Sequence, residues 1–183
     1  MKKILLAVLA SAFAFGASAA ELSFNNFGIG YTQADFSCSS DCDGFNLLGS
    51  LEINDLFSVN ADYTNINASG GSSVDFTYLG LGVRSEFSDN AAFFGQVGAA
   101  RIGIDTPFGD DSETKGFAGV GIRGMFSEQF EGEALVRKVF ASDFDASLKL
   151  TGTYFFTDTV GASLNVETND GDTGGGVGLR MNF

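Results

Sequence analysis

Apolar and polar residues alternate along most of the chain with a period of two, which is the pattern of a strand with one apolar face. Leu47 and Leu51, for example, share a face opposite Ser50 and Glu52. Continued along the chain, the alternation predicts ten strands, at 24–33, 44–53, 56–66, 74–87, 91–104, 115–126, 130–140, 146–156, 159–167 and 175–183. An eight-strand count stays open if two weaker segments, such as the first or the seventh, are not strands.

Short and long connections alternate between these predicted strands. The longer, polar connections are 34–43, 67–73, 105–114, 141–145 and 168–174, and the others have only two or three residues. This is the layout of a transmembrane β-barrel with short periplasmic turns and longer outer loops. Lipid offers no hydrogen-bond partner to the backbone, so a sheet that spans a membrane must close on itself. The sequence therefore predicts an all-β fold, a closed antiparallel transmembrane β-barrel.

An internal repeat of the form G-x-G-[VIL]-R-x-x-F occurs at 80–87, 119–126 and 176–183. A period of two sends its glycines and its arginine to one face and its phenylalanine to the other. We therefore expect a lumen charge network near the periplasmic end, made of Arg84, Arg123, Arg180, Glu52, Asp62, Glu86, Glu131 and Glu133. The network either fills the lumen with ion pairs or forms the selectivity ring of a narrow pore. The neighbouring glycines leave room for long side chains from the opposite wall, which favours filling.

The first 20 residues have the pattern of a secretory signal peptide. Lys2 and Lys3 precede a mainly apolar run at 4–15, and small residues follow up to Ala20. The apolar run is shorter than the ~20 residues that a membrane-spanning helix needs. We expect cleavage after Ala19 or Ala20, which leaves 21–183 as the barrel domain in an oxidising compartment.

Composition narrows the possible functions. The chain has 10 basic and 23 acidic residues, a formal net charge of −13, which argues against binding of nucleic acid. It has no histidine, so it has no Ser-His-Asp triad, no Cys-His dyad and no histidine zinc ligand. Glu131 and Glu133 could form a hydrolytic carboxylate pair, but inward arginines make ion pairing the better interpretation. We therefore expect no enzyme, no catalytic residue, no metal and no cofactor.

The long connections contain two further features. Cys38 and Cys42 are the only cysteines, and in an oxidising compartment we expect them to form a disulfide that shapes the first long loop. Acidic residues recur two apart, as in Asp170 and Asp172. Such carboxylates are either solvated or bind divalent cations that bridge to lipopolysaccharide phosphates.

The chain resembles the small outer-membrane β-barrel proteins of Gram-negative bacteria, the OmpA/OmpX-like transmembrane barrels. The resemblance rests on the signal peptide, on hairpins such as 79–100 and on the terminal residues 180–183. Loop length and strand count also resemble a quorum-regulated outer-membrane protein family of xanthomonads. The resemblance implies insertion in the outer membrane, contact with its lipid and lipopolysaccharide, and a monomer. Leu179, Met181 and Phe183 resemble the signal by which the barrel-assembly machinery recognises its clients.

Three functional hypotheses follow from these patterns. The first is a non-enzymatic integral outer-membrane barrel with a structural or surface-interaction role and a largely side-chain-filled lumen. The second is a small, weakly cation-selective pore for ions or small solutes. The third is a soluble secreted β-sandwich, because the strands of a sandwich alternate in a similar way.

Overall fold

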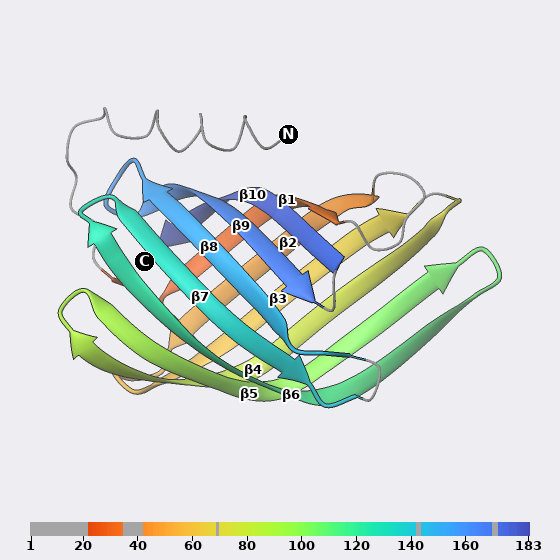
Figure 1. Cartoon of the computed structure of the whole chain (residues 1–183), viewed down its shortest axis with the longest axis horizontal. Coiled ribbons are helices and arrows are strands. Elements are labelled where there is room, and N and C mark those ends of the chain that lie inside the picture. The colour runs from red at the N-terminus through yellow and green to blue at the C-terminus, as the bar shows by residue number, and fades with distance from the viewer. Residues whose placement is uncertain (1–21, 35–41, 69, 142–143, 170–171) are drawn as a thin grey trace.

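The computed structural model describes residues 22–34, 42–68, 70–141, 144–169 and 172–183, which form one closed antiparallel β-barrel of ten strands (Figure 1). The strands are β1 (Asn26–Ala34), β2 (Cys42–Glu52), β3 (Phe57–Ala68), β4 (Ser72–Ser88), β5 (Ala91–Thr106), β6 (Gly109–Ser127), β7 (Phe130–Val139), β8 (Ser147–Phe155), β9 (Val160–Asn169) and β10 (Asp172–Asn182). Each strand pairs with its neighbours in the chain, and β1 pairs with β10. The predicted fold class and strand count are confirmed. The eight-strand and two-sheet alternatives are wrong, because both weak segments form strands of a single closed sheet.

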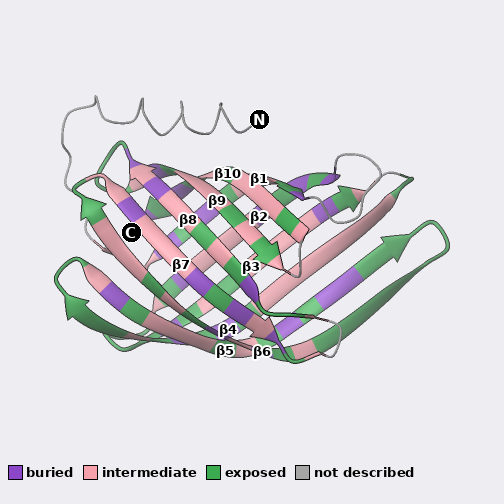
Figure 2. Ribbon diagram, viewed as in Figure 1, coloured by how far each residue is buried: buried purple, intermediate pink, exposed green. Residues whose placement is uncertain are grey.

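The alternation in the sequence corresponds to the two faces of the barrel wall. Leu81, Val97 and Val120 point outward and are 59%, 59% and 66% exposed. Figure 2 shows buried or half-buried and exposed positions in turn along the strands. An outward apolar band suits contact with lipid acyl chains, whereas the polar inward positions share the narrow lumen. No helix among the described residues is long and apolar enough to cross a membrane.

The two ends of the barrel differ. The short turns β4–β5, β6–β7 and β8–β9 lie at the same end as the C-terminus, which we call the termini end (Figure 1). The opposite end carries the β3–β4 and β5–β6 turns, and we call it the loop end. The sequence analysis predicts longer connections at both of these places.

Part of the loop end is more regular than the sequence analysis predicts. The expected loop at 105–114 is a continuation of β5 and β6, paired as far as Thr106 with Gly109 around a turn at Pro107 and Phe108. A proline in such a turn costs no ladder hydrogen bond, and the Thr106 hydroxyl donates to the Gly109 carbonyl at 2.8 Å. β6 pairs with β7 only from Phe117 onward, so the hairpin extends beyond its neighbour.

A second predicted loop, at 67–73, is also shorter than expected. Gly70 and Gly71 have φ values of 88° and 80°, in the left-handed region that glycine adopts without steric cost. Their tight turn allows β3 to continue to Ala68 and β4 to begin at Ser72.

The seam between β1 and β10 closes the barrel. Its register runs from Asn26 with Asn182 to Ala34 with Gly174, and the Phe183 amide donates to the Asn25 carbonyl at 3.1 Å. The expected assembly signal therefore lies on the closing strand and just beyond it. Its apolar side chains all lie on the outer face and are about half exposed: Leu179, Met181 and Phe183. Recognition of these residues by the assembly machinery stays a prediction.

Two glycines of β2 test how tightly the sheet is packed. A methyl group at Gly44 would collide with the carbonyl oxygen of Asn65 on β3, whereas at Gly49 the nearest atom is the Asn26 carbonyl oxygen at 3.8 Å. We expect Gly44→Ala to lower the free energy of unfolding by about 1–3 kcal/mol, because backbone must move. Gly49→Ala should stay within about 0.5 kcal/mol of the parent. Urea unfolding in detergent micelles measures both values, and equal losses would contradict the packing described.

Candidate functional site in the barrel lumen

A layer of ion pairs crosses the lumen near the termini end. Its arginines come from the three copies of the repeat, where β4, β6 and β10 approach their turns or terminus. Its acids come from β2 and β7. We call this set the basal charge layer: Glu52, Arg84, Arg123, Glu131, Glu133 and Arg180.

The most buried part of the basal charge layer joins β6, β7 and β10. The Arg123 Nε lies 2.7 Å from Glu133 Oε2, and its guanidinium also pairs with Glu131 at 3.7 Å. Arg180 donates from Nη1 to Glu131 Oε1 at 2.5 Å and from Nη2 to Oε2 at 3.3 Å. The Glu131 side chain is 1% exposed and that of Arg180 is 6% exposed. A carboxylate so deeply buried needs these donors, since an unpaired charge would carry a large desolvation penalty.

The remaining pair of the layer lies nearer the rim. Arg84 forms a salt bridge with Glu52, and its Nε donates to the Asp55 carbonyl at 2.8 Å. Glu86 contacts Arg84 at 3.6 Å, but its side chain is 59% exposed. Glu86 is therefore a peripheral partner and contributes little compared with the buried pairs.

The residues before β1 fill the space below the arginines. Phe24 is 5% exposed, and its ring centroid lies 5.0 Å from Arg84 Cζ and 4.6 Å from Arg123 Cζ. It also packs edge-on against Phe94, with centroids 6.0 Å apart. An aromatic face beneath two guanidinium groups is a favourable cation–π arrangement, which gains strength where water is excluded.

Hydrogen bonds hold this segment in place. The Ser23 carbonyl accepts from Arg123 Nη1 and from Arg180 Nη2, both at 3.2 Å. The Phe24 amide donates to Glu52 Oε1 at 3.2 Å. We call residues 22–25 the N-terminal plug. The sequence analysis places residues 24 and 25 in a strand and misses the plug, although Phe24 is a large apolar residue on the polar, inward side of the alternation.

A second set of charges crosses the lumen further toward the loop end. Arg137 Nη1 lies 3.5 Å from Asp62 Oδ2, and its Nη2 lies 3.3 Å from Glu167 Oε1. Lys149 pairs with the same oxygen of Asp62 at 3.5 Å. We call these four residues the upper charge layer. The Arg137 guanidinium also stacks on the Tyr78 ring, 3.6 Å from its centroid.

The expected grouping of Asp62 with the repeat arginines is wrong. Asp62 pairs with Tyr78 of β4 in the sheet register, six residues before Arg84, which places it at a different height. Its partners, Arg137 and Lys149, were not among the residues selected from the sequence. The alternation could have found Arg137, since it has the same parity in β7 as Glu131.

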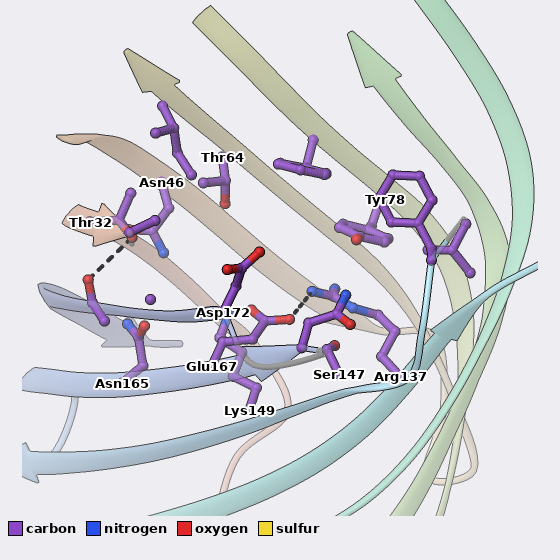
Figure 3. Close-up of a pocket in the computed structure, with 18 of the residues that line it drawn as sticks. Thr32, Asn46, Thr64, Tyr78, Arg137, Ser147, Lys149, Asn165, Glu167 and Asp172 are labelled. Carbon is purple, nitrogen blue, oxygen red and sulfur yellow. Dashed lines mark hydrogen bonds and ion pairs between the residues drawn. The ribbon is translucent and has the colours of Figure 1, made fainter. Parts of the chain in front are cut away.

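A cavity of about 130 Å³ lies on the loop-end side of the upper charge layer (Figure 3). We call it the vestibule. One part of its wall is polar and the other is mainly aromatic or aliphatic. Its principal lining residues are Thr32, Asn46, Thr64, Ile66, Phe76, Tyr78, Arg137, Val139, Phe144, Ser147, Lys149, Asn165, Glu167, Asn169 and Asp172. A second cavity of about 120 Å³ lies between the two charge layers.

Two expectations for the long loops fall partly outside the described ranges. Cys42 begins β2 and is 1% exposed, but Cys38 lies outside the described residues, so the disulfide stays a prediction. Of the acidic pair in the last loop, Asp172 is described and Asp170 is not. Within the described ranges, no group of three or more acidic, cysteine or histidine side chains could hold a metal ion.

Comparison with known proteins identifies the architecture. No protein-family profile and no curated protein matches the sequence. Among solved structures, the KdgM porin aligns with 86% of this chain and 99% of its own at 10% identity, with a TM-score of 0.52. The fold is that of an outer-membrane β-barrel.

Two other outer-membrane barrels align more loosely. The N-terminal barrel domain of Pseudomonas aeruginosa OprF covers 87% of this chain and 98% of its own, at 14% identity and a TM-score of 0.42. Neisserial surface protein A aligns with 88% of this chain and 98% of its own, at 15% identity and a TM-score of 0.43. At 10% identity, the likeness to the KdgM porin shows a shared fold and no shared function.

Removing one arginine tests the basal charge layer. We expect Arg123→Ala to lower the free energy of unfolding by about 3–5 kcal/mol, because it leaves Glu133 buried without its main partner. Arg101→Ala is the matched control, since Arg101 is exposed and its described side-chain bond is a 3.4 Å contact with Ser112. The control should change the value by less than about 0.5 kcal/mol. Urea titration in micelles measures the free energy of unfolding of both variants. Similar losses would show that the basal ion pairs stabilise the barrel no more than the exposed Arg101 does.

Proposed function

We propose that the protein is a non-enzymatic integral outer-membrane barrel whose lumen is closed at the termini end and whose role is structural or one of surface interaction. This proposal rests on the packing of the N-terminal plug against the basal charge layer. Phe24 lies under two arginines, and the Ser23 carbonyl accepts hydrogen bonds from Arg123 and Arg180. A diffusion pore needs a continuous path of water at this height, and the contacts of Ser23 and Phe24 with the arginines support a blocked path.

The exterior supports insertion in a membrane. Aromatic side chains that are about half exposed or more gather near the short turns, where an interfacial girdle belongs: Phe57, Phe87, Phe93, Phe126 and Phe156. The proposed signal peptide at 1–20 would direct export, and the assembly machinery would insert the chain. Lipid and lipopolysaccharide are the proposed surroundings of a monomer.

The loop end supports a role in surface interaction. The β5–β6 hairpin extends past β7 and presents Phe108, which is fully exposed at its tip. Acidic side chains surround this tip, including Asp105, Asp110 and Asp111. Such a rim repels other acidic surfaces and attracts cationic ones.

Ion pairing supports the absence of an enzymatic role. Glu131 and Glu133 share one face of β7, and each accepts a hydrogen bond from an arginine. Charge-assisted hydrogen bonds of this kind hold the strands together, so the pair is better suited to cohesion than to hydrolysis.

Fractionation tests the location. We expect the mature protein to accompany the outer membrane and to migrate faster on gels before heating than after it, as a closed barrel resists the detergent until heated. Cell fractionation and paired heated and unheated samples make this measurement. Folded protein in the soluble periplasmic fraction would overturn the membrane assignment.

Conductance tests closure of the lumen. The basal charge layer balances three arginines against three glutamates, so Arg123→Ala leaves an excess of negative charge and a gap beside Phe24. In planar bilayers we expect little or no wild-type conductance, and a leak in Arg123→Ala that favours cations. Arg101→Ala should behave as the wild type. Large, stable wild-type channels that become smaller in Arg123→Ala would instead establish a pore.

A further inference from the structure

The polar wall of the vestibule includes three side chains that face the cavity. Asn46 is 7% exposed, Thr64 and Asn165 are half-buried, and Figure 3 shows all three around the cavity. In the described part of the chain, no hydrogen bond from a protein group satisfies these three side chains. Their amides and hydroxyl are open to the cavity, so they are available to an occupant that both donates and accepts.

The neighbouring part of the wall is apolar, and its position follows from the sheet register. Asn46 pairs with Thr64, Thr64 with Phe76, and Phe76 with Ile102 on successive strands, so polarity falls from strand to strand around the barrel wall. Phe76, Tyr78 and Phe144 pack against a buried cluster of Ala100, Ile102, Phe117 and Val139. This packing fixes the apolar wall, which presents a firm surface to an occupant.

Charge around the vestibule disfavours anions. The two cations of the lining, Arg137 and Lys149, are already balanced by Asp62 and Glu167 in the upper charge layer. Asp145 and Asp172 also line the cavity; Asp145 lies 3.8 Å from Lys138 Nζ, whereas Asp172 adds negative charge on the loop-end side. An entering anion would meet this negative excess before it reached a free cation.

Space for an occupant comes from β10. Gly174 lines the cavity, and a methyl group there would meet nothing closer than the Gln33 carbonyl oxygen at 3.4 Å. The cavity volume of about 130 Å³ is below the ~300–1,000 Å³ of a drug-sized pocket, so an occupant has at most one ring and part of it extends toward the loop end.

We infer that the vestibule binds a single neutral sugar ring that enters from the loop end. The hydroxyl groups of a sugar donate and accept, which matches the amides of Asn46 and Asn165 and the hydroxyl of Thr64. The C–H face of the ring matches the aromatic wall at Phe76 and Tyr78. This binding does not depend on closure of the termini end, because the vestibule lies on the other side of the upper charge layer.

Saturation-transfer NMR on the mature protein in detergent micelles tests the inference. The probes are the methyl glycosides of D-glucose, D-galactose and D-mannose, with methyl D-glucuronide as the anionic probe and D-glucosamine as the cationic probe. We expect at least one neutral glycoside to bind with a millimolar dissociation constant and the glucuronide to bind at least tenfold more weakly.

Three variants locate the site. Asn46→Leu should weaken binding of the neutral glycoside at least tenfold, because a similar volume replaces the amide. Gly174→Leu should abolish binding by filling the cavity while it removes no polar group. Asn60→Leu is the matched control, since Asn60 lies on β3 between the charge layers and bonds to Ser50 rather than facing the vestibule. It should bind as the wild type does, and heat-modifiable migration on gels confirms that each variant is folded.

Several results would overturn the inference. No saturation transfer from any of the three neutral glycosides to the wild type would do so. Binding of the glucuronide or of glucosamine alone would assign the vestibule to a charged ligand. Binding that survives Gly174→Leu, or that Asn60→Leu weakens as much as Asn46→Leu does, would place the ligand elsewhere.

Discussion

Every backbone N–H and C=O within a lipid bilayer must find its partner in the protein, and the rest of this structure depends on that requirement. It is met only when the last strand pairs with the first, from Asn26 with Asn182 to Ala34 with Gly174. Closure of ten strands then fixes a narrow lumen whose walls are the polar half of an alternating sequence. The apolar half lies on the outer face of the barrel. The polar and charged side chains of the lumen are therefore a consequence of barrel closure as much as of any binding role.

A narrow lumen constrains which residues can point inward. Large side chains fit only where their neighbours are small, and the repeat glycines supply such space for Leu135 over Gly119 and for Phe94 over Gly121. Each guanidinium in turn needs an acid, because a charge left alone in a low-dielectric interior is costly. The two charge layers divide the interior into a space between them and a vestibule at the loop end. Their further partners differ: the Ser23 carbonyl of the N-terminal plug accepts from Arg123 in the basal layer, whereas the Tyr78 ring stacks on Arg137 in the upper layer.

Strands and barrel closure could be predicted from the sequence because period two, turn length and the need for closure are local or general properties. Ion-pair partners across the lumen could not be predicted, because a period of two shows on which face of the sheet a residue lies but not its height along the barrel axis. Asp62 was therefore assigned to the wrong arginines. The plug was missed because Phe24 leaves the sheet to fill a space that exists only once the barrel is closed. The β5–β6 hairpin was taken for a loop because polar, acidic residues beyond the membrane lose the apolar alternation although they keep the strand.

The N-terminal plug is covalently continuous with β1, with no linker between Asn25 and Asn26. It therefore behaves as an intramolecular ligand of the basal charge layer, with an effective concentration of the order that short tethers produce, about millimolar or higher. A soluble molecule that competes for the same arginines must exceed that concentration to displace it. A displaced plug is accordingly at an advantage over a soluble competitor, since it remains next to its own binding site.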